Sequence, residues 1–158
     1  MSEPAEPGEP PRAVFDTGVV LQAALNPTGP ASRALELLDA GQIQVYASPR
    51  LRSEYEEILQ RPAIRARFPR LTDARIAAAL QRFDERAILI PNPPRRVAYP
   101  RDPDDEPVLN LAIHVEAHYI VARDNDLLDL ADDAQFGRLF PAIRIVDPVA
   151  LLQEIPRS

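Results

Sequence analysis

The sequence predicts an α/β protein, a three-layer α/β/α sandwich around a mostly parallel central sheet. Short apolar runs that suit buried strands alternate with segments in which apolar residues recur every three or four positions, as in helices. Strands that alternate with helices form parallel sheets covered on both faces. At 158 residues the chain has room for a sizeable core. We expect residues 12–158 to form a single domain behind a disordered leader, residues 1–11, which is rich in Pro, Glu and Gly.

The elements follow from local composition. Strands are predicted over residues 12–16, 43–47, 87–90, 118–122 and 143–146. Helices are predicted over residues 17–25, 31–40, 49–60, 61–70, 73–86 and 148–155, with a short helix around 127–128. Ser48-Pro49 and Thr72-Asp73 are helix starts, because the hydroxyl of Ser48 or Thr72 can cap the first turn. Gly41 ends the second helix.

Composition excludes several kinds of site. The chain has no cysteine, so disulfides, thiolate zinc sites and cysteine nucleophiles are ruled out. His114 and His118 are four apart, a metal-binding spacing on one helix, but a predicted break near Ala117 puts His118 on a strand. The net charge of −6 argues against broad electrostatic binding to nucleic acid, although a local basic rim stays open. The sequence contains no apolar run long enough to span a membrane, so we expect a cytoplasmic protein.

A dense acidic segment begins another predicted helix. Four acids fall within residues 102–106, and Pro103 and Pro107 can stand only before or within the first helical turn. Asp105 lies three, four and seven residues before the apolar stripe of Val108, Leu109 and Ala112. It therefore heads the face that should be buried, where a carboxylate is costly unless it is paired or binds a cation. A surface helix cap is the alternative.

Carboxylates from four distant stretches are predicted to meet. Asp16 and Asp124 each follow a predicted strand, Asp105 heads a helix, and Glu54 lies on the first turns of the helix after another strand. Sites in open parallel sheets form at the carboxyl ends of strands and at the helix starts that follow. Oxygen ligands suit a hard cation, so we predict a magnesium or manganese site.

Each acid also has a purely structural interpretation. Asp16 could cap the next helix, Glu54 could pair with Arg50, and Asp124 could form a turn with Asp126. If all the acids act in this way, the chain is an α/β domain without metal.

The motifs, taken in order, resemble the PIN-domain family. They are Ala13-Val14-Phe15-Asp16-Thr17, Ser48-Pro49, Glu54-Tyr55, Arg101-Asp102-Pro103-Asp104-Asp105, Tyr119-Ile120-Val121 and Asp124-Asn125-Asp126-Leu127-Leu128. Within that family the chain is most similar to toxin components of toxin–antitoxin systems, the relatives of VapC-type toxins.

The resemblance implies a three-layer α/β/α fold and a ribonuclease that depends on magnesium or manganese. It assigns catalysis and metal binding to Asp16, Glu54, Asp105 and Asp124, with Asp104 and Asp126 as auxiliary ligands. It also implies an RNA substrate, an antitoxin partner and a homodimer. Arg101 and Arg123 flank the acidic centre in sequence, where they either hold RNA phosphates or are simply solvated.

Two positions depart from the family pattern. Gly18 stands where the family usually has asparagine, and Ala122 stands where it usually has serine or threonine. The first change removes an amide that could orient a metal-binding carboxylate, and the second removes a hydroxyl that could bind water or phosphate. They favour an alternative interpretation, a catalytically weakened PIN-like domain that serves as a binding module.

Overall fold

A computed structural model describes residues 8–96 and 103–155 and contains a five-stranded parallel sheet. The strands are β1 (Arg12–Phe15), β2 (Gln44–Ala47), β3 (Ile88–Leu89), β4 (Tyr119–Val121) and β5 (Arg144–Val146). Their order is β3-β2-β1-β4-β5, and every neighbouring pair is parallel. The predicted α/β class with a parallel sheet is confirmed.

Helices connect the strands in the described part of the chain. They are α1 (Thr17–Leu25), α2 (Pro30–Asp39), α3 (Pro49–Gln60), α4 (Pro62–Arg67), α5 (Asp73–Arg86), α6 (Glu106–His114), α7 (Asn125–Leu130), α8 (Ala134–Leu139) and α9 (Pro148–Glu154). A short 3₁₀ helix, η1 (Pro103–Asp105), leads directly into α6.

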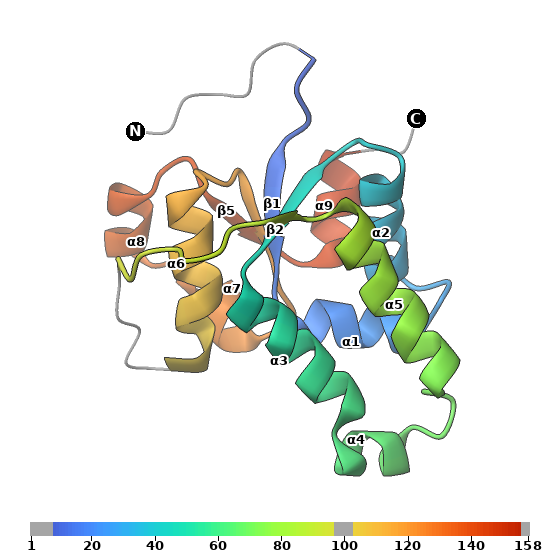
Figure 1. Cartoon of the computed structure of the whole chain (residues 1–158). Coiled ribbons are helices and arrows are strands. Elements are labelled where there is room, and N and C mark those ends of the chain that lie inside the picture. The colour runs from blue at the N-terminus through green and yellow to red at the C-terminus, as the bar shows by residue number, and fades with distance from the viewer. Residues whose placement is uncertain (1–7, 97–102, 156–158) are drawn as a thin grey trace.

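The sheet lies between helices on both sides. Helix α6 packs against β1 and β4, while α2 and α9 pack against each other on the opposite side (Figure 1). Helix α3 contacts α1, α5 and α6 and extends past the carboxyl ends of the strands. The parallel arrangement brings the residues after β1, β2, β4 and β5 to the same edge of the sheet, which we call the carboxyl edge.

Strand β1 lies at the centre of the core. Ala13, Val14 and Phe15 are fully buried, and Phe15 meets Phe83 of α5 edge-on with ring centroids 6.1 Å apart. The ring of Tyr55 in α3 lies 5.0 Å from that of Phe83. The aromatic contacts therefore fix α3 and α5 against the strand whose end carries Asp16.

Some boundaries differ from those predicted. The basic segment 61–70 is helical only over α4, because Pro69 disfavours the helical conformation at Phe68. Helix α8 was not predicted, since it has six residues and buries none of them. Residues 1–7 of the expected leader lie outside the described residues, and the Pro11 carbonyl already accepts a hydrogen bond from the Gln44 amide.

Candidate active site

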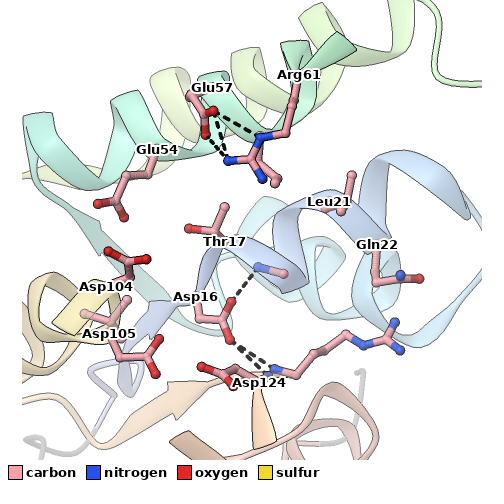
Figure 2. A pocket seen from close by; sticks show the side chains of 14 residues that line it. Asp16, Thr17, Leu21, Gln22, Glu54, Glu57, Arg61, Asp104, Asp105 and Asp124 are labelled. Atoms are coloured by element: carbon pink, nitrogen blue, oxygen red, sulfur yellow. Dashed lines mark hydrogen bonds and ion pairs between the residues drawn. The ribbon is translucent and has the colours of Figure 1, made fainter. Parts of the chain in front are cut away.

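A pocket of about 650 Å³ opens at the carboxyl edge of the sheet, and carboxylates line it. All four acids singled out in the sequence lie in it, together with one auxiliary acid: Asp16, Glu54, Asp104, Asp105 and Asp124. Figure 2 shows these side chains arriving from α3, from the start of α6 and from the ends of β1 and β4. Residues up to 108 positions apart in the chain thus share one solvent-reachable cavity.

Asp16 is held tightly at the end of β1. Its side chain is only 5% exposed, and it caps α1 by accepting a hydrogen bond from the Gly18 amide. The second carboxylate oxygen accepts from the amides of Arg123, at 3.1 Å, and Asp124, at 3.4 Å. Burial raises the pKa of the Asp16 carboxyl above its ordinary value of 3.8, and these amides oppose the rise. The predicted cap is therefore present, and the same carboxylate lines the pocket.

Tyr55 of α3 stabilises this end of β1. Its hydroxyl is completely buried and donates a hydrogen bond to the carbonyl of Phe15, the residue before Asp16. Complete burial raises the pKa of Tyr55 well above 10.0, so the hydroxyl stays a neutral donor. Tyr55 also follows Glu54 directly, so one turn of α3 both supports β1 and supplies an acid to the pocket.

Glu54 forms the ion pair with Arg50 that the sequence offers as an alternative to metal binding. Its Oε1 lies 3.5 Å from Nε of Arg50, one turn earlier in α3. Partial burial raises the pKa of Glu54 above its ordinary value of 4.5, Arg50 opposes this, and the negative charge of Asp104 adds to it. A weak, exposed pair of this kind contributes little stability, and it leaves the carboxylate facing the pocket.

Three acids, Asp105, Asp124 and Asp126, lie close enough together to hold a metal ion. One oxygen from each lies within 4.8 Å of the others. Asp105 is 8% exposed and makes no capping hydrogen bond to α6. Asp124 caps α7 by accepting from the Asp126 amide at 3.0 Å, as the turn interpretation expected. Asp126 belongs to this group although it does not line the pocket itself.

The rim carries residues that the sequence reasoning did not single out. Glu57 and Arg61 line the pocket mouth and are joined by an ion pair of 2.7 Å (Figure 2). They lie three and seven residues after Glu54, so helical spacing could have placed them on the same face. Arg123 lines the pocket, whereas Arg101 lies outside the described residues.

The two histidines take no part in the pocket. His114 ends α6, and His118 precedes β4, so the predicted break between them is present. Nδ1 of His118 accepts a hydrogen bond from the Arg12 amide at 3.0 Å, which gives it a structural role. Burial and the positive charge of Arg12 lower the pKa of His118, so the acceptor form is favoured.

Fold and site together define an α/β domain with a carboxylate-lined pocket at the carboxyl edge of a parallel sheet. The chain belongs to the PIN domain family, whose profile matches residues 12–126 and so includes all four principal acids. Proteins of this family are in general nucleases, which are hydrolases, and typically use divalent metal ions. The chain is also 30% identical over 128 residues to an uncharacterized protein of Methanocaldococcus jannaschii, MJ1680, covering 81% of this chain and 80% of that protein.

No helix within residues 8–96 and 103–155 is both long enough and apolar enough to cross a membrane.

Proposed function

We propose that this protein is a magnesium- or manganese-dependent endoribonuclease, the toxin of a toxin–antitoxin pair. The observation that carries the proposal is the meeting of Asp16, Glu54, Asp105 and Asp124 in one pocket. The family match supports nuclease chemistry in general. RNA as the substrate and the toxin role rest on the resemblance of the sequence motifs.

The donor set fits a hard divalent cation. The group of Asp105, Asp124 and Asp126 offers three carboxylate oxygens within 4.8 Å of one another, and Asp16 and Glu54 line the pocket beside it. Magnesium and manganese prefer such oxygen ligands. We assign Asp16, Glu54, Asp105 and Asp124 as principal ligands, with Asp104 and Asp126 as auxiliary ones. A bound ion would supply Lewis-acid activation of the phosphodiester and of the attacking water.

The side chains of this chain then divide the remaining work. Asp16 keeps one orientation because amides hold both of its oxygens. One of the pocket carboxylates would orient the attacking water or accept its proton. Arg123, and Arg101 before the acidic helix, would contact RNA phosphates. By analogy with the family, attack of water in line on the phosphorus would break the bond to the 3′ oxygen, which takes up a proton, and would leave a 5′-phosphate and a 3′-hydroxyl.

The departures at Gly18 and Ala122 favour the alternative function, a catalytically weakened binding module. Gly18 still donates its backbone amide to Asp16, so part of the orienting contact survives without an asparagine side chain. Ala122 is fully buried two residues before Asp124, and it offers no hydroxyl for water or phosphate. Measuring RNA cleavage tests whether the retained Gly18 amide is sufficient for activity or whether the two departures abolish it.

The partners we propose follow the same resemblance. They are an RNA substrate, a cognate antitoxin protein and a second copy of this chain, in the cytoplasm. Copurification with the product of the neighbouring reading frame would test the antitoxin, and light scattering would test the homodimer.

Cleavage of labelled RNA with and without manganese tests the proposed activity. The wild-type protein should cut only with the metal, and Asp16→Asn should lose at least about a hundredfold of that activity. Asp132→Asn is the matched control, because Asp132 is an exposed acid outside the pocket. Metal binding without cleavage would favour the binding module. Absence of metal binding in calorimetry would contradict both functions.

A further inference from the structure

A second pocket continues the acidic one along the carboxyl edge. It measures about 410 Å³ and lies between the end of α1, the start of α2 and the start of α9. Gln22 and Arg123 line both pockets, so the two are neighbours with a shared wall. Asp147, the residue after β5, lies in the second pocket, just as Asp16 and Asp124 follow β1 and β4 in the first.

The chemistry of the second pocket differs from that of the first. Among the described residues that line it, Asp147 is the one acid and Arg123 the one base. Asp147 caps α9 by accepting from the Ala150 amide at 2.8 Å. The remaining lining combines amide side chains with apolar surfaces, those of Leu128 and Val149 among them. Such a lining suits a flat, neutral, hydrogen-bonding group, whereas the first pocket suits a cation and a phosphate.

Polar groups at the junction have hydrogen-bonding capacity to spare. Within residues 8–96 and 103–155, the Gln22 amide and the Arg123 guanidinium make no hydrogen bond or ion pair. Asn26 uses its Oδ1 to accept from the Thr28 amide at 3.3 Å, which leaves its NH₂ group to donate elsewhere. Amide side chains that present donors beside acceptors are the groups that read base edges.

The wall that carries Asn26 is preformed. The Ser32 hydroxyl is buried and lies 2.9 Å from the carbonyls of both Ala23 and Asn26, which ties the end of α1 to α2. Gly29 brings its backbone close to the Asn26 side chain, since a Cβ there would lie 2.6 Å from Nδ2. A site with fixed walls loses less entropy when it binds its ligand.

We propose that this second pocket binds the nucleobase of the nucleotide next to the scissile phosphate, and that Gln22 and Asn26 select it. The inference rests on the proposed ribonuclease function and adds a base preference on one side of the cut. A phosphodiester in the acidic pocket must continue into a nucleoside on each side. The route along the carboxyl edge leads past the cation Arg123 into a pocket of nucleoside size.

Two variants that exchange asparagine for aspartate test the selection. Asn26→Asp keeps the acceptor that Thr28 uses but replaces the donor group with a carboxylate oxygen. Asn92→Asp makes the same change in charge at an exposed residue that lines a different pocket. Cut sites mapped on a randomised RNA should show one flanking position with a base bias of about tenfold, the effect of a good base contact. That bias should change in Asn26→Asp and persist in Asn92→Asp.

A binding measurement separates this proposal from the proposed activity. Adenosine, guanosine, cytidine and uridine carry no phosphate and need no metal, so each can be titrated into the labelled protein and followed by NMR. We expect one of them to shift the amides of Gly29, Ala31 and Val149, and Asn26→Asp to weaken that response about tenfold. Nucleoside binding without RNA cleavage would contradict the ribonuclease activity and support nucleobase binding in the second pocket. Cleavage without a flanking base bias, or equal behaviour of the two variants, would contradict nucleobase binding there.

Discussion

The buried hydrogen bond from the Tyr55 hydroxyl to the Phe15 carbonyl lies next to Asp16, and removing it should have a definite cost in the free energy of unfolding. Tyr55→Phe deletes one oxygen and leaves the ring, including its contact with Phe83, in place. The Phe15 carbonyl then loses its side-chain donor in a completely buried environment. Removing one partner of a buried hydrogen bond costs the desolvation of the other, which amounts to about 1–3 kcal/mol of unfolding free energy.

The expected cost translates into a measurable melting shift. A chain of this length loses about 2–4 °C of Tm per kcal/mol, so Tyr55→Phe should melt about 2–12 °C below the wild type. Because Phe15 precedes Asp16, the loosened strand end should also weaken manganese binding in calorimetry. Denaturant unfolding followed by circular dichroism provides the free energy directly.

Tyr119→Phe is the matched control for this experiment. The Tyr119 hydroxyl contacts Glu154 at 3.3 Å in a half-exposed position, where water can replace it. That variant should lose less than about 0.5 kcal/mol, because contacts accessible to water contribute little net free energy. Equal losses in the two variants, or a loss below that value in Tyr55→Phe, would refute the assignment of the buried bond.

Three further predictions concern the pocket acids and Gly18, which departs from the family pattern. Manganese at about a hundred times its dissociation constant should stabilise the protein by about 2.7 kcal/mol, and Asp124→Asn, but not Asp132→Asn, should lose this gain in a thermal melt. In EDTA, the contribution of Asp16 to stability should fall as pH rises from 3.8 through its raised folded-state pKa, because the native state binds the extra proton; Asp16→Asn should remove this slope in denaturant titrations. Gly18→Asn should tighten manganese binding about tenfold in calorimetry, because the added amide can orient Asp16 once the carboxylate gives way by a few tenths of an ångström to a Cβ that would lie 3.3 Å from its Oδ1; weaker binding would contradict an orienting role.

The parallel sheet was predictable because its strands are short, apolar and separated by helices. The buried positions of the long helices follow from spacing in the same way: Ile76, Leu80 and Phe83 recur every three or four residues, and all three are buried in α5. The order β3-β2-β1-β4-β5 could not be predicted from the apolar pattern, because the pattern shows where strands lie in the chain but not which strands pair in the sheet. Helix α8 was missed for a related reason, since none of its residues is buried and it therefore lacks an apolar stripe.

The pocket acids show why the sequence indicates which residues come together but not which hydrogen bonds and ion pairs they form. The sequence offers capping and site formation as alternatives for Asp16 and Asp124, and in the structure both residues cap a helix and line the pocket. The two roles coincide because a helix that follows a parallel strand begins at the carboxyl edge, where the pocket lies. A carboxylate has two oxygens with several acceptor positions, so one interaction does not exhaust it. Glu54 follows the same rule, since it forms the ion pair with Arg50 that the sequence offers as an alternative and also lines the pocket. That pair must open or rearrange if Glu54 is to bind a cation, so Arg50→Ala should strengthen manganese binding if Glu54 is a ligand and leave it unchanged if it is not.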